Sequence, residues 1–326
     1  MPVRFPRLLA ALALLLAAAF AVAGCAGPDP DQAAGPSAAP LAGHGTVNTG
    51  PEQHRIRAQK IDSIAAQVPA AIRAKGTLVV GLDGTGSPPL TFRADDDQTV
   101  IGVEPDIAQL VADTLGLRLE LRPTSWENLF LAVDSGQYDT GFSNITVTEE
   151  RKDKYDFATY RVDTLAFEAT KNSPIEHVAK PADIAGRTVA VAAGTNQEQI
   201  LVRWDAQNRA AGLPPVKIQY YQSPGDYYLA LQSGRIDLYL GPNPGSAYHV
   251  AVKGDTKIVG QVSGGGEIAA DIAAMTKKGN GLVGPLSGAL NELIKSGQYA
   301  QVLARWNLSG EAVSTSQVNP PGLPRS

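Results

Sequence analysis

The 326-residue chain contains a single cysteine, Cys25, and only four histidines. One cysteine cannot form a disulfide within the chain, and it cannot build a cysteine-based zinc cluster. The histidines are scattered and lack the HExxH spacing of zinc proteases. The 28 basic residues nearly balance the 32 acidic residues, and no basic stripe marks a nucleic-acid interface. We therefore expect no metal, no cofactor and no nucleic-acid partner.

Long hydrophobic runs are also missing, except at the N-terminus. Residues 8–23 are uninterruptedly apolar and follow Arg4 and Arg7. As a helix this run would span about 24 Å, which is less than the ~30 Å hydrocarbon core of a bilayer. The pattern predicts that residues 1–24 are a signal peptide, with a short membrane anchor as the alternative.

The apolar run ends in small residues immediately before the cysteine, in the order Ala21-Val22-Ala23-Gly24-Cys25. This segment resembles the bacterial lipobox, which implies that Cys25 is lipidated and becomes the new N-terminus; a free or buried cysteine is the alternative. Two lipid chains on one residue suffice for stable anchoring. Residues 25–55 would then be the lipidated cysteine and a flexible tether, because their first part is rich in Ala, Gly and Pro without periodicity.

Strand and helix patterns alternate through the rest of the chain. In the first half, the expected helices are 56–74, 107–115 and 126–135, and the expected strands are 77–81, 117–121 and 138–142. In the second half, strands are expected at 188–192, 216–220 and 236–240, with helices at 194–210 and 225–233. This alternation predicts doubly wound α/β sheets, and the length fits two lobes better than one.

One segment occurs twice, which supports a repeat of the lobe. Residues 131–139 (LAVDSGQYD) resemble residues 229–237 (LALQSGRID), at an offset of 98. Both copies combine a helix, a Ser-Gly stop and an aspartate before a strand, although Ser-Gly is also a common helix end. The repeat predicts that Asp139 and Asp237 are structural turn residues.

The loops after four predicted strands are rich in Gly, Ser, Thr and Asn. They comprise residues 81–89, 143–151, 194–197 and 241–244. In open α/β sheets, ligands bind beyond the carboxyl ends of the strands. Arg151 lies in one of these loops and can hold a carboxylate with two parallel hydrogen bonds.

Seven motifs occur in a fixed order along residues 75–308: GVEPDIA at 102–108, TVTEER at 146–151, FATY at 157–160, GRTVAV followed by GT at 186–195, GRID at 234–237, KKGN at 277–280 and GQY with RW at 297–306. Together they resemble the solute-binding proteins of polar amino-acid ABC importers, family 3. The resemblance implies a type II periplasmic-binding-protein fold, in which two lobes are joined by a hinge of two crossings, near 161–168 and 263–271. Lobe 1 would comprise residues 56–164 and 267–310 and lobe 2 residues 165–266, followed by a flexible tail at 311–326.

The resemblance further implies a function. The protein would be exported, anchored on the extracytoplasmic face of the cell membrane and monomeric. It would bind an amino acid or a related small carboxylate between its lobes and present it to ABC permease subunits. Two alternatives stay open: a ligand-sensing lipoprotein for a membrane receptor, and an enzyme like the cyclohexadienyl dehydratases. The enzyme would need a general acid or base in the cleft, and no recognisable pair is present, so we expect a binding protein.

The resemblance also implies roles for individual residues. Arg151 would bind the ligand carboxylate, while Trp126 would pack against the ligand and Asp83 would reach it from lobe 1. As alternatives, Arg151 could be an ordinary surface residue, Trp126 part of the core and Asp83 a turn cap. Further hydrogen-bonding or closing residues would be Ser143, Asn144, Thr146, Ala192, Thr195, Asn196, Gln197 and Asn243.

One position departs from the family pattern. An aspartate that accepts the ligand ammonium is expected five residues after Asp237, but Pro242 stands there. No carboxylate follows before Asp255, and Asn243 can only accept a hydrogen bond without supplying charge. A standard amino acid is the expected ligand, with an amine-modified or non-amino-acid carboxylate as the alternative.

Overall fold

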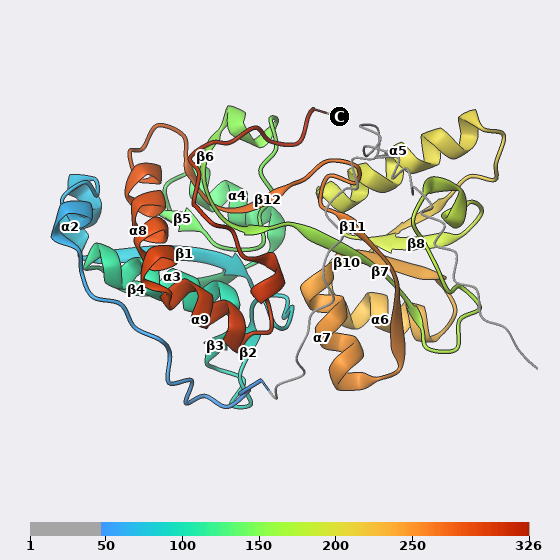
Figure 1. Cartoon of the computed structure of the whole chain (residues 1–326), viewed down its shortest axis with the longest axis horizontal. Coiled ribbons are helices and arrows are strands. Elements are labelled where there is room, and N and C mark those ends of the chain that lie inside the picture. The colour runs from blue at the N-terminus through green and yellow to red at the C-terminus, as the bar shows by residue number, and fades with distance from the viewer. Residues whose placement is uncertain (1–46, 326) are drawn as a thin grey trace, which may run out of the picture. The chain divides into compact units, whose positions relative to one another are not determined.

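The computed structural model describes residues 47–325, which all belong to one compact unit. The predicted signal peptide, Cys25 and the tether up to residue 46 lie outside the described residues. Two mixed five-stranded sheets organise the described part, together with a small two-stranded sheet of β2 (Phe92–Arg93) and β3 (Val100–Ile101). Each large sheet is the centre of one lobe (Figure 1).

The first large sheet has the order β4-β1-β5-β12-β6. Its strands are β4 (Arg118–Thr124), β1 (Thr77–Asp83), β5 (Thr140–Gly141), β12 (Asp271–Lys277) and β6 (Tyr155–Val162). Strand β1 pairs in parallel with β4 and β5, whereas β12 is antiparallel to β5 and β6.

The second large sheet has the order β11-β7-β10-β8-β9. Its strands are β11 (Thr256–Ser263), β7 (Thr164–Thr170), β10 (Leu238–Pro242), β8 (Thr188–Val191) and β9 (Lys217–Tyr220). Strand β8 pairs in parallel with β10 and β9, and β7 is antiparallel to β10 and β11. In each sheet, three parallel strands are therefore followed by one strand of opposite direction, β12 or β7, and then by an edge strand that again runs with the first three, β6 or β11.

The chain crosses between the lobes twice, from β6 to β7 and from β11 to β12. Strand β6 ends at Val162 and β7 begins at Thr164, so Asp163 alone makes the first crossing. The return runs through residues 264–270, between β11 and β12. In Figure 1 the chain passes from the first sheet to the second through β6 and β7, and it returns through β11 and β12. This confirms the two-lobed fold with two crossings.

Helices cover both faces of each sheet. In lobe 1, α3 (Val103–Leu115), α8 (Val283–Ser296) and α9 (Gln298–Arg305) share one apolar core with β1, and α4 (Trp126–Asp134) packs on the opposite face. In lobe 2, α5 (Asn196–Ala210) and α6 (Pro224–Gln232) belong to separate cores on either side of the sheet. Helix α7 (Asn243–Lys253) follows β10. Because parallel strands and helices alternate, the helix N-termini gather at the carboxyl edges of the strands.

Local signals explain several helix ends. Helix α3 stops at Gly116, whose φ of 68° is accessible to glycine at little cost. Side chains cap the start of helix α5: the Thr195 hydroxyl accepts from the Glu198 amide, and the Glu198 carboxylate accepts from the amide of Gly194, the residue before the N-cap. The C-terminus of α3 and the N-terminus of α5 are therefore determined by one or two residues each.

The helix expected over 56–74 is wrong. The structure has only α1 (Asp62–Ala65) and α2 (Ala70–Lys75) there, separated at Pro69. Proline disfavours helix at the preceding residue. The residues before α1 instead contact α3: Arg57 pairs with Asp113, 2.6 Å away.

The lobe repeat has a structural counterpart. Asp139 accepts a hydrogen bond from the Val79 amide at 2.7 Å, and Asp237 accepts one from the Thr188 amide at 2.8 Å. Each aspartate thus fastens the turn to the first strand of its own sheet. The prediction that both are structural turn residues is confirmed.

The end of the predicted tether is packed rather than free. Arg55 pairs with Asp106 of α3 at 2.8 Å, and the Gln53 side chain is buried. A buried Asp106 attracts a cation because an unpaired carboxylate would pay the full cost of desolvation. The ordered body therefore begins before residue 56.

The expectation of a loosely packed C-terminal tail is also wrong. Glu311, at the end of the short helix η3 (Ser309–Glu311), is buried against Arg161. Farther on, Asn319 bonds the Phe157 amide, and Leu323 is buried. Residues 312–325, the described segment after η3, are rich in proline and glycine and form no regular helix or strand. Their side chains and backbone nevertheless form hydrogen bonds and apolar contacts with lobe 1.

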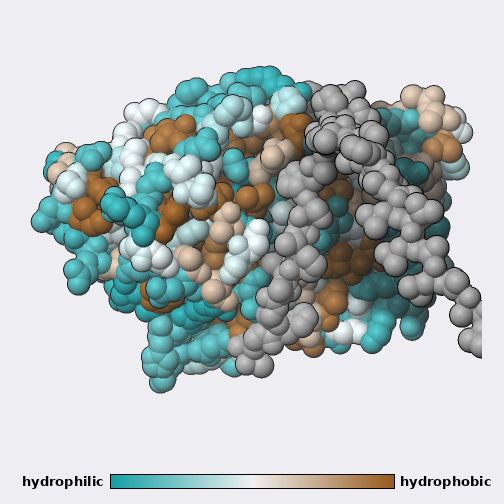
Figure 2. All heavy atoms as spheres, viewed as in Figure 1, coloured by the Kyte–Doolittle hydropathy of each residue, from teal (hydrophilic) through white to brown (hydrophobic). Residues whose placement is uncertain are grey.

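The described residues 47–325 contain no helix that is both long and apolar enough to cross a bilayer. On the coloured part of the face in Figure 2, hydrophobic residues are interspersed with hydrophilic ones. Several large apolar side chains are nevertheless exposed, among them Leu131 and Leu229 at equivalent positions of the repeat.

Candidate functional site

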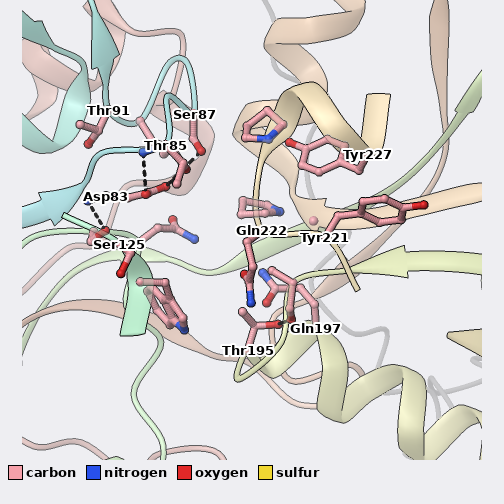
Figure 3. Close-up of a pocket in the computed structure, with 18 of the residues that line it drawn as sticks. Asp83, Thr85, Ser87, Thr91, Ser125, Thr195, Gln197, Tyr221, Gln222 and Tyr227 are labelled. Carbon is pink, nitrogen blue, oxygen red and sulfur yellow. Dashed lines mark hydrogen bonds between the residues drawn. The ribbon is translucent and has the colours of Figure 1, made fainter. Parts of the chain in front are cut away.

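A cavity of about 140 Å³ lies between the lobes. It opens beyond the carboxyl ends of β1, β4, β8, β9 and β10 and at the N-termini of α4, α5 and α6. Its lobe 1 wall contains Asp83, Thr85, Ser87, Leu90, Thr91, Glu104, Ser125, Trp126, Glu127, Ser143 and Asn144. Its lobe 2 wall contains Ala192, Thr195, Asn196, Gln197, Tyr221, Gln222, Pro224, Tyr227, Tyr239, Leu240, Gly241 and Pro242. Figure 3 shows the two walls facing each other.

Asp83 forms hydrogen bonds with three other residues of the lobe 1 wall. Its carboxylate accepts from the Thr85 amide at 2.9 Å, from the Thr85 hydroxyl at 2.7 Å and from Ser87 Oγ at 3.3 Å. Its own amide donates to Ser143 Oγ at 2.9 Å. Asp83 thus shapes the turn after β1, as the alternative interpretation held, and also lines the cavity.

A buried cluster of charged residues lies next to the cavity. Arg161 lies fully buried between Glu104, at 2.6 Å, and Glu311. Asn144 links this cluster to the cavity: its amide donates to Glu104, its side-chain oxygen accepts from Arg161, and its φ is 50°. Asparagine tolerates this left-handed conformation better than most residues. Glu104 is therefore neutralised by Arg161 although it faces the cavity.

Helix α5 presents its N-terminus from lobe 2. Asn196 and Gln197 begin the helix, and the Gln197 side-chain oxygen is buried without a hydrogen-bond partner. In lobe 1, the hydroxyl of Thr91 is likewise buried without a partner. A buried polar atom without a hydrogen bond destabilises the fold. Both residues line the cavity, so polar groups of a ligand could form hydrogen bonds with these two atoms.

Several aromatic rings line the cavity. The rings of Tyr227 and Tyr239 stack with centroids 3.8 Å apart, and Figure 3 shows Tyr221 and Tyr227 on the lobe 2 wall. Trp126 projects from α4, where its ring packs edge-to-face with Phe130. Trp126 was expected at the ligand, and it does line the cavity while also packing on lobe 1.

Arg151 lies beside the cavity rather than in its lining. Its guanidinium stands 5.3 Å from the centre of the Trp126 ring, and it donates to the Thr146 carbonyl at 2.8 Å and to the Gly194 carbonyl of lobe 2 at 3.1 Å. Burial lowers its pKa to about 10, which leaves it charged at neutral pH. Within the described residues it has no ion pair. A guanidinium carries five N–H donors, and the hydrogen bonds of Arg151 to the two carbonyls use only two of its three nitrogens.

Two predicted ligand contacts turn toward the hinge. Asp163 accepts from the Thr146 hydroxyl at 2.7 Å and from the Asn196 amide group at 2.8 Å. Burial raises the pKa of Asp163, and these hydrogen bonds oppose that effect. Thr146 belongs to lobe 1 and Asn196 to lobe 2, so the crossing residue fastens both lobes. Thr146 does not line the cavity, whereas Asn196 does.

Asn243 is also outside the cavity lining. Its side-chain oxygen accepts a hydrogen bond from Gln261 of β11 at 2.7 Å, and only 3% of the residue is exposed. The structure therefore gives Asn243 a partner within lobe 2 and does not support its expected ligand contact. The remaining predicted residues, Asp83, Trp126, Ser143, Asn144, Ala192, Thr195, Asn196 and Gln197, come together around the cavity.

The sequence analysis missed part of the site. Ser125 follows β4, and Tyr221 and Gln222 follow β9. Both strands were predicted, and the rule about carboxyl strand ends applies to them as well. Applying it to all the parallel strands would have found these residues.

The family model of the bacterial extracellular solute-binding proteins, family 3, matches residues 78–309. The chain belongs to this family. The match covers both lobes and both crossings, and it confirms the resemblance that the ordered motifs indicated.

Two curated relatives are named for the amino acid that they bind. The L-cystine-binding protein TcyJ of Escherichia coli is 32% identical over 238 residues, which cover 72% of this chain and 84% of that protein. The arginine-binding protein ArgT of Corynebacterium glutamicum is 29% identical over 262 residues, covering 79% of this chain and 83% of that protein.

A solved structure bears on the enzyme alternative. The ancestral amino acid-binding protein AncCDT-1, a precursor of cyclohexadienyl dehydratase, matches with a TM-score of 0.63 and 26% identity, over 72% of this chain and 97% of that chain. Even this neighbour of the dehydratases is named for binding. The relatives TcyJ and ArgT are likewise named as binding proteins. Within residues 47–325, no group of His, Cys, Asp and Glu could hold a metal ion.

Proposed function

We propose that this family 3 protein binds an amino acid or a closely related small carboxylate between its lobes and presents it to an ABC transporter. The observation that carries the proposal is Arg151, a partly buried cation without an ion pair beside a cavity lined from both lobes. The names of the relatives support the same ligand class.

The ligand carboxylate would lie against Arg151 and the N-terminus of α5. A guanidinium and a helix N-terminus both favour an anion, and Arg151 can form two parallel hydrogen bonds with a carboxylate. Ser143 and Thr195, whose hydroxyls lie on opposite walls, would complete the polar contacts. Trp126 and the tyrosines would cover the apolar part of the ligand.

Binding between the lobes would favour the conformation in which the walls meet. In this structure Arg151 already bonds the Gly194 carbonyl across the cleft, and Asp163 holds groups of both lobes. A ligand that contacts both walls has a higher affinity for the closed form, and this difference in affinity drives closure. The closed form would then be the one that the transporter recognises.

A thermal-shift screen of residues 26–326 against amino acids, amines, opines and small sugars tests the ligand class. We expect a carboxylate to raise the melting temperature, and Arg151→Ala to abolish that shift. Arg209→Ala, on the exposed part of α5, is the matched control and should leave the shift unchanged. A shift that survives Arg151→Ala would contradict the carboxylate assignment.

We also propose that Cys25 carries the lipid that anchors the protein at the outer face of the membrane. The support is the run of small residues before Cys25 after an apolar segment. Anchoring would keep the protein near its transporter and raise their effective concentration. Cys25→Ala should move the protein from the membrane fraction to the soluble or secreted fraction. Retention of the variant at the membrane would contradict the proposal.

A further inference from the structure

A second and larger cavity, of about 540 Å³, adjoins the first. The two cavities share six lining residues, namely Ser87, Leu90, Pro224, Tyr227, Tyr239 and Pro242. Pro242, which ends β10, therefore stands where the cavities meet. A ligand held in the first cavity would reach the second by extending past Pro242.

The distribution of charge around the first cavity determines what can lie beside Pro242. The carboxylates of the lining are Asp83, Glu104 and Glu127, and all of them belong to lobe 1. Arg161 neutralises Glu104, and three hydrogen bonds within its own turn already use the oxygens of Asp83. The lobe 2 lining has no acidic residue. A ligand ammonium beside Pro242 would be partly desolvated without a counter-charge on its own wall, because the carboxylates of Asp83 and Glu127 lie on the lobe 1 wall; this is less favourable than burial beside a lobe 2 carboxylate.

An acylated nitrogen avoids this cost. An amide is uncharged at neutral pH, and its single N–H needs only a neutral acceptor. The lobe 2 wall contains neutral hydroxyl groups that can accept this hydrogen bond, among them that of Tyr239, which also shares a hydrogen bond with Tyr227. Burial raises the pKa of Tyr239 well above its usual value, so this hydroxyl remains protonated and uncharged. The wall is therefore better matched to an amide than to an ammonium.

The second cavity fits the substituent of such a nitrogen. Aromatic rings dominate its lining: the phenol of Tyr228 stacks on the imidazole of His249 with centroids 3.5 Å apart, and Tyr248 contacts Phe92 of lobe 1. Flat apolar walls of this kind accommodate aromatic or aliphatic groups.

The lining of the second cavity also contains polar side chains, among them Gln232, Lys253 and Asp255. One carboxylate oxygen of Asp255, Oδ1, is buried without a hydrogen-bond partner. The other oxygen accepts from Gln232 at 2.6 Å. Oδ1 lies 3.8 Å from His249 Nε2, and it would accept a hydrogen bond from a donor at the distal end of a long ligand, such as the terminal ammonium of a dipeptide.

We infer that the ligand is an elongated carboxylate whose α-nitrogen is acylated, with the acyl substituent in the second cavity. N-acyl amino acids and dipeptides share this chemistry. The inference rests on the proposed function, because it places the carboxylate at Arg151.

Calorimetric titration of matched ligands tests the inference. Each standard L-amino acid is compared with its N-acetyl and N-benzoyl derivatives and with the dipeptide that carries glycine at its N-terminus. For at least one side chain, an acylated form should bind at least about tenfold more tightly than the free amino acid. Preference for the N-benzoyl derivative would indicate an apolar acyl group, and preference for the dipeptide would indicate recognition at Asp255.

Variants of the second cavity locate the substituent. Gly245 lines only the second cavity, and the nearest atom to an added Cβ would be the Pro88 carbonyl oxygen at 3.8 Å. Gly245→Phe should fill the cavity and remove the advantage of the acylated ligand. Tyr248→Ala removes a ring instead of adding one, and it should weaken the same ligand if the filled variant does not fold.

The outcomes separate this inference from the proposed function. If free amino acids bind in an Arg151-dependent manner and no acylated form binds better, the inference is overturned and the proposed function stands. The same holds if both cavity variants keep the advantage of the acylated ligand. If neither free nor acylated compounds bind, both the inference and the carboxylate assignment fall.

Discussion

Glu311 makes the stability of this protein depend on pH in a defined direction. Burial raises the pKa of its carboxyl group from 4.5 to about 7, although Arg161 and Thr164 donate hydrogen bonds to it. Between these values the unfolded chain releases the proton while the folded chain retains it. Stability from this group is therefore complete below the lower value and is lost as the pH rises through the higher one.

The substitution Glu311→Gln isolates this contribution, because glutamine is a neutral side chain of the same shape. A displacement from 4.5 to about 7 corresponds to about 3 kcal/mol in total. Most of it falls between pH 5 and pH 8. Over this range, the free energy of unfolding of the variant relative to the wild type should rise by about 2 kcal/mol.

Urea denaturation of both proteins, followed by tryptophan fluorescence at several pH values, measures this difference. The comparison cancels other titrating groups, such as Asp163. Circular dichroism should give coincident transitions, which would show that the two lobes unfold together. If the variant instead loses stability relative to the wild type as the pH rises, ionised Glu311 is stabilised by Arg161 and the reasoning is refuted.

Three further predictions concern the framework of the site. An added Cβ at Gly264 would lie 2.1 Å from the Asp163 carboxylate, which cannot move freely, so Gly264→Ala should lower the free energy of unfolding by about 1–3 kcal/mol; an unchanged urea midpoint would contradict the close contact. Asp139→Ala and Asp237→Ala should each cost about 1–3 kcal/mol in the same assay, because each leaves a strand amide unpaired; a loss in only one lobe would refute the equivalence of the two turns. Removal of residues 312–326 should lower the melting temperature by several degrees, since Leu323 and Asn319 lose their contacts, whereas an unchanged temperature would restore the view of a free tail.

The sequence predicted the lobes well because their parallel strands are short apolar segments followed by glycine and polar residues. Residues 77–81 and 188–192 showed this pattern, and they became β1 and β8. The antiparallel strands were not predicted. Residues 155–170 are almost continuously buried, so neither an alternating nor a helical period identifies them.

Individual site residues were harder to predict than the position of the site. The carboxyl ends of strands indicated where to look, and most of the expected side chains did line the cavity. Side-chain direction could not be read from the sequence, because it depends on partners distant in the chain. Thr146 turns toward Asp163 and Asn243 toward Gln261, and neither pairing has a local signal.

The central claim is that Arg151 holds a ligand carboxylate between the lobes. Its most direct test is calorimetric titration of the wild type and Arg151→Ala with the best ligand from the screen and with the same compound lacking its carboxyl group. Loss of a buried charged partner costs about 2–5 kcal/mol, so either change should weaken binding by about 30-fold or more. Applying both changes should cost little more than one. Similar affinity of the wild type for the two compounds, or fully additive losses, would contradict the account.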